Sequence, residues 1–261
     1  MFPQHILVYE RVISMFNTAI LCVPRSEAIR HAGNYLSEAG LQVSPKPAPD
    51  ISHVLLPIPS FPTGDEYLAH ILSDLPDDVI ISGGNLSSPL LKNYTAVDFL
   101  QDPYYLAENA AITAACALRI VREQLTAPLA GQRVLIVGWG RIGKCMCRLF
   151  EKENAAVTVA ARKASDRAMV SALGCCSISI EEATEETDRY DVIINTVPVM
   201  VLPDIRTKEN AVLLELASKP GMAGTNILDC RGLPSKMAPD ASGRLIAETF
   251  IRLCLGREDK R

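Results

Sequence analysis

The sequence predicts an α/β protein of two domains. Apolar runs that read as strands alternate with segments of helical periodicity along most of the chain, which is typical of parallel sheets covered by helices. The 261 residues suffice for two modest domains, and a content of 48% hydrophobic and 21% charged residues indicates a globular protein. An alanine-rich segment near residues 102–125 divides two such regions. We therefore expect two parallel sheets joined by one long helix.

Residues 1–102 are expected to form the smaller domain. Ser26 is a candidate N-cap for its first helix, and Gly40 is a candidate stop for the same helix. A second helix is expected near residues 65–72. Strands are expected at residues 17–23, 41–44, 53–58, 78–82 and 94–97, with a further short strand at residues 6–9.

A long helix is expected to connect the domains. Asp102 followed by Pro103 predicts its start, because Asp favours the N-cap and Pro the first helical position. Its alanines permit close packing as far as about Leu125, before Pro128. Residues 103–128 are therefore assigned to a crossing helix and linker.

The most informative stretch follows this helix. A buried-strand pattern at residues 134–137 leads into a G-x-G-x-x-G turn and then into helical periodicity, the context of a dinucleotide-binding Rossmann fold. Gly138 would permit the tight turn, Gly140 would let the backbone approach a pyrophosphate, and Gly143 would let the helix pack on the strand. The alternative is a glycine-rich turn that binds no ligand.

The rest of the chain completes this second domain. Further strands are expected at residues 156–160, 177–180, 191–195 and 211–216. A final helix from about Pro239 would bury Leu245, Ile246, Thr249, Phe250 and Leu253. We expect a C-terminal Rossmann domain at residues 129–239, beside a smaller flavodoxin-like or Rossmann-like N-terminal domain. Residues 240–261 are expected to form a C-terminal helix that could pack back on the first domain.

The second strand of the Rossmann pattern indicates which dinucleotide binds. NAD sites usually carry a carboxylate about 20 residues after the glycines, where it binds the ribose hydroxyls. Here Ala161, Arg162 and Lys163 follow the strand. Arg162 can bind a 2′-phosphate bidentately, so the sequence favours NADP over NAD. The alternative is a solvated loop.

Ligands of open α/β sheets lie beyond the carboxyl ends of the strands, which singles out two further segments. Asn195 and Thr196 could bind nicotinamide or ribose, or only cap the strand end. Lys219 could bind an anionic substrate, or be a solvated loop residue. The expected cofactor site contains Gly138, Trp139, Gly140, Arg141, Ile142, Gly143, Ala161, Arg162, Lys163, Asn195, Thr196, Val197, Pro198, Ala217 and Ser218.

Composition excludes several other classes of protein. A net charge of −4 without a basic cluster argues against nucleic-acid binding. The uncharged stretch at residues 12–24 is too short to span a bilayer and follows no basic segment, so we expect a cytoplasmic protein that does not bind membranes. All four histidines precede residue 71, whereas a D-2-hydroxyacid dehydrogenase needs a late histidine base.

The eight cysteines are expected to be reduced and mostly buried. Cys145 and Cys147 are separated by one residue, and Cys175 and Cys176 by none. Neither spacing matches zinc or thioredoxin-like motifs, so no metal site is expected.

Five segments resemble the A subunit of dipicolinate synthase, an enzyme of spore-forming bacteria. They are residues 137–143, 161–162, 191–202 and 214–221, and, around the last helix, residues 232–234 with 238–239. In the first domain the resemblance is limited to residues 81–83 and to Ala107 and Glu108. Asn109 replaces a family glycine, and Cys22 to Arg25 stand where the family has a glycine-rich turn.

The resemblance implies oxidation of a dihydrodipicolinate-type ring to dipicolinate, with hydride passing to NADP and with a flavoprotein partner, the B subunit. It implies a small dicarboxylate substrate held by Ser82 and Lys219 with Ser218 beside them, and Glu108 as a base. Glu108 could instead be a solvent-facing helix residue. We also expect a homo-oligomer. The alternatives are an NADP-dependent reductase of another keto or imino acid and a regulatory protein that binds NADP without turnover.

Overall fold

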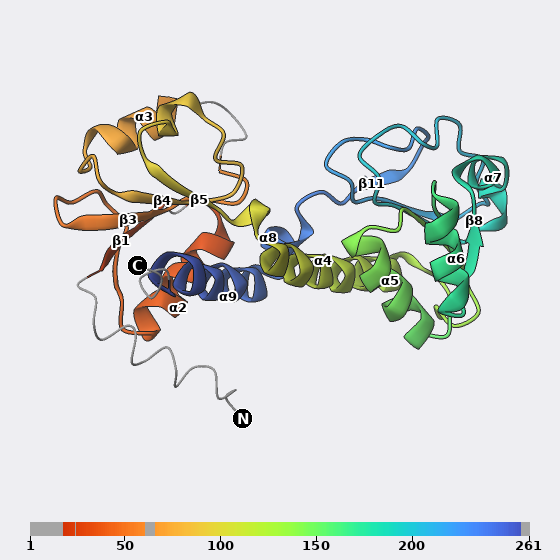
Figure 1. Ribbon diagram of the computed structural model, residues 1–261. Helices are drawn as coiled ribbons and strands as arrows, with labels where there is room; N and C mark the ends of the chain where they lie inside the picture. Colours follow the sequence, from red (N-terminus) through yellow and green to blue (C-terminus); the bar gives the residue numbers. More distant parts are fainter. Residues whose placement is uncertain (1–17, 24, 61–65, 257–261) are drawn as a thin grey trace. The chain divides into compact units, whose positions relative to one another are not determined.

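The computed structural model describes residues 18–23, 25–60 and 66–256 (Figure 1). The chain divides into two compact units, each with one parallel sheet. Unit 1 contains the described parts of residues 1–109 and 235–261, and unit 2 contains Ala110–Pro234. The predicted two-domain α/β fold is therefore confirmed. The short strand expected at residues 6–9 lies outside the described residues.

Unit 1 has a five-stranded sheet in the order β2-β1-β3-β4-β5, the flavodoxin-like order. All neighbouring strands in it are parallel. The strands are β1 (Ala19–Cys22), β2 (Gln42–Ser44), β3 (Ile51–Leu55), β4 (Ile80–Gly83) and β5 (Thr95–Asp98). Each lies within a few residues of its predicted position. The apolar runs of β1 and β3 are buried on both faces, as expected for inner strands of a parallel sheet.

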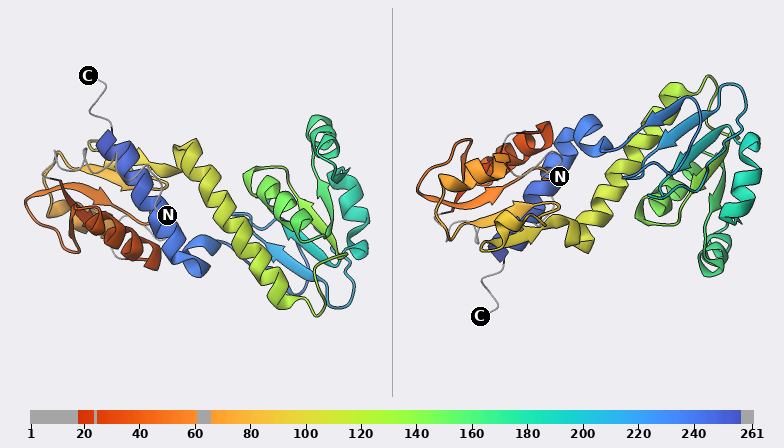
Figure 2. Two further views of the ribbon diagram at one scale, coloured as in Figure 1. Left: turned by 90° about the horizontal axis from the view of Figure 1, so that it is seen from below. Right: turned by 90° about the horizontal axis from the view of Figure 1, so that it is seen from above.

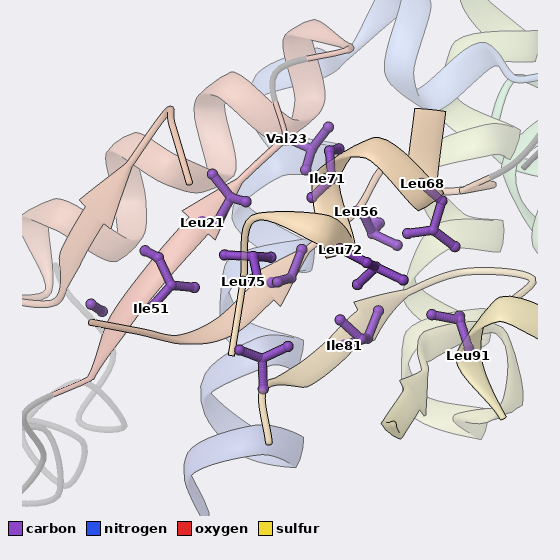
Figure 3. Packing of buried hydrophobic residues seen from close by; sticks show 13 residues of the cluster. Leu21, Val23, Ile51, Leu56, Leu68, Ile71, Leu72, Leu75, Ile81 and Leu91 are labelled. Atoms are coloured by element: carbon purple, nitrogen blue, oxygen red, sulfur yellow. The ribbon is translucent and has the colours of Figure 1, made fainter. Parts of the chain in front are cut away.

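Helices cover the sheet of unit 1. Helix α2 (Glu27–Glu38) begins after Ser26, whose Oγ accepts a hydrogen bond from Ile29 N at 3.3 Å. It ends before Gly40, whose φ of +90° suits glycine, so both predicted end signals are confirmed. Helix α3 (Glu66–Ser73) packs Leu68 and other apolar residues against the sheet. Figure 3 shows this core, which includes Leu21, Leu56 and Ile81.

Helix α9 (Pro239–Phe250) lies beside α2 within unit 1, as Figures 1 and 2 show. The contact is close, because a Cβ added at Gly243 would lie 2.5 Å from His31 Cβ and 2.6 Å from Ala28 O. The prediction that Leu253 is buried is wrong, since its side chain is only half-buried. It lies in the π-helical turn η4 (Ile251–Leu255), which changes the helical phase and buries Cys254 instead.

Helix α4 (Pro103–Gln124) has residues in both units. It starts where the sequence predicts, because Asp102 Oδ2 accepts a hydrogen bond from Tyr105 N at 2.7 Å. Pro103 occupies the first helical position, where no amide donor is needed. The predicted end near Leu125 is confirmed within one residue.

Unit 2 has a six-stranded parallel sheet in the order β11-β10-β9-β6-β7-β8. Counted from β6, this is the classic Rossmann order 3-2-1-4-5-6 read from the other edge. The strands are β6 (Arg133–Val137), β7 (Ala156–Ala160), β8 (Cys176–Ile178), β9 (Val192–Asn195), β10 (Val212–Glu215) and β11 (Ile227–Asp229). The chain reverses direction across the sheet between β6 and β9, which is where such folds bind ligands.

The helices of unit 2 are α5 (Arg141–Lys152), α6 (Ala164–Ala172) and α7 (Ile180–Glu185), and α8 (Leu233–Met237) lies at the boundary with unit 1. The sequence did not lead us to predict α6, α7, α8 or the short strand β11. Within the described ranges, none of the helices combines the length and apolar character needed to cross a membrane.

Candidate functional site

The turn between β6 and α5 is built by two glycines that no other residue could replace without movement. Gly138 has a φ of +109°, and a Cβ there would lie 2.4 Å from Thr196 Oγ1. A Cβ at Gly143 would lie 2.1 Å from Gly138 O. The first glycine therefore permits the turn, and the second permits close packing of α5 against it.

Gly140 differs, because a Cβ added there would have no atom within 4 Å. This residue is the N-cap of α5 and provides no side-chain hydrogen bond to the helix. The first amides of α5 therefore lack a side-chain acceptor at the N-cap, in the open space beside Gly140. A dinucleotide diphosphate fits this place, since it accepts hydrogen bonds from such amides and needs the room that a Cβ would fill.

A cavity of about 400 Å³ adjoins the turn. It is lined by residues that follow three neighbouring strands of the sheet, β6, β7 and β9, together with residues of α6 and α7. Among the expected cofactor residues it brings together Gly138, Trp139, Gly140, Ala161, Arg162, Lys163 and Val197. Arg141, Ile142 and Gly143 form the first turn of α5 next to it.

Arg162 and Lys163 lie exposed at the end of β7, on the wall of the cavity. Their loop is fixed by Arg167, whose Nη1 donates to Ala161 O and to Arg162 O, both at 2.9 Å. Lys163 is also the N-cap of α6, so the free amides of that helix lie beside the two cations. This end of the cavity is suited to an anionic group.

Two carboxylates also line the cavity. Asp166 lies in the first turn of α6 and Glu181 in the first turn of α7. Hydrogen bonds from its own backbone amide and from the Ser179 hydroxyl lower the pKa of Glu181, which is therefore ionised at neutral pH. The place directly after β7, where NAD-binding proteins carry their acidic residue, is occupied by Ala161 and Arg162.

The side chains of Asn195 and Thr196 bind the protein itself. Asn195 is fully buried, donates from Nδ2 to Val197 O at 3.0 Å and accepts at Oδ1 from Val197 N at 3.0 Å. Thr196 Oγ1 donates to Val137 O at 2.8 Å. The donors and the acceptor of the Asn195 amide are thus used at the strand end, and direct binding of a cofactor by this amide is not supported. Capping of the strand end is the alternative that the sequence left open.

Glu215, at the end of β10, organises this edge of the sheet, and no sequence pattern led us to it. Its Oε1 accepts from Asn195 Nδ2 at 2.8 Å and from Ala217 N at 3.1 Å. Its Oε2 accepts from Gly221 N at 2.8 Å and from Met222 N at 3.2 Å. The side chain is buried, so these bonds compensate its desolvation and fix two loops. The sequence signal that could have indicated this role is a carboxylate at the end of the apolar strand Val212–Glu215.

The loop held by Glu215 carries Ala217, Ser218 and Lys219. Ala217 is buried, whereas Ser218 and Lys219 are exposed. Pro198 is likewise exposed, on the loop after β9. Lys219 can therefore meet an anion from solvent, and it is held on a loop that is anchored at both ends.

The two candidate substrate residues of unit 1 differ in accessibility. Ser82 is fully buried in β4, and its Oγ donates to Val54 O of β3 at 2.9 Å. This placement does not support the expected role of Ser82 in binding a substrate carboxylate, because its hydroxyl is used within the sheet. Glu108 is exposed on α4.

Known proteins share both the sequence pattern and the fold, although no protein-family model matches the chain. The A subunit of dipicolinate synthase from Bacillus subtilis (strain 168) is 26% identical over 237 residues, which are 79% of this chain and 79% of that protein. The crystal structure of the corresponding A subunit from Bacillus halodurans superposes with a TM-score of 0.76 at 20% identity, over 94% of this chain and 99% of that one.

A transhydrogenase from Sinorhizobium meliloti superposes with a TM-score of 0.72 at 14% identity, over 96% of this chain and 88% of that chain. Both structural likenesses show the fold, and the curated relative carries the sequence resemblance. The resemblance predicted from the five segments is thus confirmed: the chain is similar in sequence to the dipicolinate synthase A subunit, and it shares the two-domain Rossmann-type fold of these structures.

Proposed function

We propose that the chain is an NADP-linked oxidoreductase of the dipicolinate synthase A type, which oxidises a dihydrodipicolinate-type ring to dipicolinate. The observation that carries the proposal is the open helix N-terminus at Gly140, joined by one cavity to Arg162 and Lys163. The curated relative supports the choice of reaction by its name.

The cofactor's diphosphate would rest on the first amides of α5 beside Gly140, and its 2′-phosphate on Arg162, Lys163 and the first amides of α6. A guanidinium and an ammonium suit a phosphate dianion, and Arg167 keeps their loop in place. Asp166 lies farther along, in α6, and not at the strand end that contacts ribose in NAD proteins. NADP is therefore the proposed cofactor, and when bound it supplies the hydride acceptor.

The substrate would be a small dianion, for which Lys219 provides a positive charge and Ser218 a neighbouring hydroxyl. Both are exposed, and Glu215 holds their loop in one position. Glu108 is proposed to accept the proton released on aromatisation, because its carboxylate is exposed on α4. Ser82 has no part in this proposal.

We further propose that the chain works in the cytoplasm, as a homo-oligomer and together with a flavoprotein B subunit. The curated relative is named as one subunit of a synthase, which implies a partner for that protein.

The test mixes purified protein, alone and with a dipicolinate synthase B subunit, with a freshly generated hydroxytetrahydrodipicolinate and either NADP or NAD. The expected result is simultaneous growth of NADPH and pyridine dicarboxylate absorbance, with NADP preferred. Lys219→Met should abolish turnover without changing NADP affinity. Absence of both absorbance signals in every combination, with NADP binding intact, would indicate a regulatory protein that binds the cofactor without turnover.

A second candidate is the NADP-dependent reduction of another keto or imino acid. The burial of Ser82 favours it, because this removes one of the two carboxylate-binding groups that the resemblance implies. Consumption of NADPH with a panel of small keto acids and ammonia, in a preparation inactive on the dihydropyridine, would identify this activity.

A further inference from the structure

Three potential metal ligands converge in unit 2, away from the cavity. Among the residues that the structure describes, Cys147 Sγ, Cys175 Sγ and a carboxylate oxygen of Glu151 all lie within 4.8 Å of one another. The two sulfur atoms are 2.8 Å apart, and Cys175 Sγ donates to Glu151 Oε1 at 2.9 Å. The two cysteines are 28 residues apart in sequence, so spacing motifs do not reveal the group.

Regular structure holds the three groups in place. Cys147 and Glu151 are four residues apart on α5, so their side chains share one face of the helix. Cys175 follows Gly174, whose φ of +93° turns the chain from the end of α6 into β8. Two donors thus come from one rigid helix and the third from a tight turn.

The surroundings suit a cation with one open coordination position. Both cysteines are buried, whereas Glu151 is exposed and provides the side from which an ion and a water molecule can approach. Two thiolates and a carboxylate are a ligand set that Zn²⁺ accepts, with water as the fourth ligand.

We propose that Cys147, Glu151 and Cys175 bind one thiophilic divalent cation of the Zn²⁺ class. On binding, each thiol loses its proton to solvent, two metal–sulfur bonds and one metal–oxygen bond form, and no electron is transferred. Tetrahedral coordination with metal–sulfur bonds of about 2.3 Å sets the sulfur atoms about 3.8 Å apart, so the two side chains must separate by roughly 1 Å.

We assign this site a stabilising role despite its open position, because none of its three ligands lines the cavity. It joins the second half of α5 to the start of β8, the edge strand of the sheet. Gly140 is the N-cap of α5, so an ion bound near the other end of this helix would also stabilise the element on which, in the proposed function, the cofactor diphosphate would rest. A bound ion that is absent from the unfolded chain stabilises the folded unit by its binding free energy.

The site can be tested with the full chain, reduced with a phosphine and freed of metal. Titration with Co²⁺ should give thiolate-to-cobalt charge-transfer absorption that saturates at one ion per chain and disappears when Zn²⁺ is added. Cys147→Ala and Cys175→Ala should each abolish this absorption. Glu151→Gln, at an exposed position that folding tolerates, should weaken Co²⁺ binding at least about tenfold, since even outer-shell groups contribute that much.

Cys176→Ala is the matched control, because this exposed cysteine adjoins Cys175 in sequence but is outside the group. It should bind Co²⁺ like the parent. The proposal is overturned if the reduced parent binds no stoichiometric Co²⁺, or if both the Glu151 variant and the cysteine variants bind it unchanged. The proposal is also overturned if the parent protein forms a Cys147–Cys175 disulfide in air, seen as a mass loss of two hydrogen atoms, and then binds no Co²⁺ after reduction.

Discussion

Arg252 binds Asp102 through both carboxylate oxygens, with Nη2 2.6 Å from Oδ2 and Nη1 3.2 Å from Oδ1. The same carboxylate caps α4 through Tyr105 N. Arg252 belongs to the π-helical turn that follows α9, and its guanidinium also lies over the ring of Tyr104, 5.0 Å from the centroid. One pair therefore ties the end of α9 to the start of α4 within unit 1.

This pair predicts an acid-dependent loss of stability. The hydrogen bond from Arg252 lowers the pKa of Asp102 from its usual 3.8. Because the folded pKa is the lower one, the stabilisation is complete above about pH 4 and is lost as the pH falls towards the folded pKa. We expect Asp102→Asn to cost about 1 kcal/mol at pH 7 and to remove this part of the acid dependence.

Urea unfolding followed by circular dichroism between pH 2.5 and 7 measures the effect. Trp139, the chain's only tryptophan, lies in unit 2, so its fluorescence transition is the internal control and should be the same in the variant as in the parent at each pH. An Asp102→Asn variant with the parent's acid dependence would contradict the assignment.

Arg162 is predicted to distinguish the two nicotinamide dinucleotides. Arg162→Ala should weaken NADP binding by about 1 to 3 kcal/mol, because a charge-assisted contact to the 2′-phosphate is lost, and should leave NAD binding nearly unchanged. Isothermal titration calorimetry with both cofactors measures the difference. Arg148→Ala, at an exposed arginine of α5 that does not line the cavity, is the matched control and should change neither affinity. Equal losses for NADP and NAD would exclude a 2′-phosphate contact.

Alanine substitutions at the two turn glycines Gly140 and Gly143 are predicted to have different effects on stability and on cofactor binding. Gly143→Ala places a Cβ 2.1 Å from Gly138 O, so we expect lower thermal stability as well as weaker cofactor binding. Gly140→Ala meets no protein atom within 4 Å, so the fold should survive while cofactor affinity falls at least about tenfold.

Gly224→Ala, whose Cβ would approach no atom closer than 3.7 Å, is the control outside the turn. Thermal melts and cofactor titrations of the three variants separate the two effects. Unchanged affinity in Gly140→Ala would mean that no diphosphate rests beside Gly140.

His53 is predicted to make unit 1 sensitive to mildly acidic conditions. Burial lowers the pKa of this histidine from its usual 6.5, and its Nε2 has no hydrogen-bond partner among the described residues. The ring meets Phe250 edge-on, with centroids 5.6 Å apart. As the pH falls below 6.5 the unfolded chain takes up a proton before the folded one does, so stability declines from there towards the lowered pKa.

Replacement by a residue that does not titrate should remove this dependence. In the His53→Gln variant, the free energy of unfolding of unit 1, measured by chemical denaturation, should not change between pH 7 and pH 5. This expectation holds whatever the stability of the variant at pH 7. His70→Gln, at an exposed histidine of α3, should keep the parent's slope. A parent without any slope over this range would show that His53 does not titrate there.

Local patterns predicted the strands and the main helix ends well, because each depends on neighbouring residues. Ser26, Gly40 and Asp102 act at the positions where their conformational preferences place them. The glycine turn was recognised for the same reason, since its strand and helix adjoin it in sequence. Strand β11 was not predicted, although β2 and β8 are equally short and were.

Residues whose side chains bind partners far away in the chain could not be placed from local patterns. The sequence leaves open whether Asn195 binds a cofactor or caps its strand, because its partner Glu215 lies 20 residues later in the chain. The sequence does not show that the Ser82 hydroxyl is used within the sheet, because its acceptor, Val54 O, is 28 residues away in the chain. Spacing motifs relate Cys147 to Cys145 and Cys175 to Cys176, whereas the fold brings Cys147 and Cys175 together across 28 residues.

The packing of α9 on α2 through Gly243 has a consequence for how the chain is made. Unit 2 is one uninterrupted stretch, so it can fold on the ribosome as soon as Pro234 has emerged. Unit 1 can complete its folding only after α9 has been translated, although its sheet is translated first. A nascent chain paused before residue 239 would therefore expose the apolar face of α2, a natural target for chaperones during synthesis.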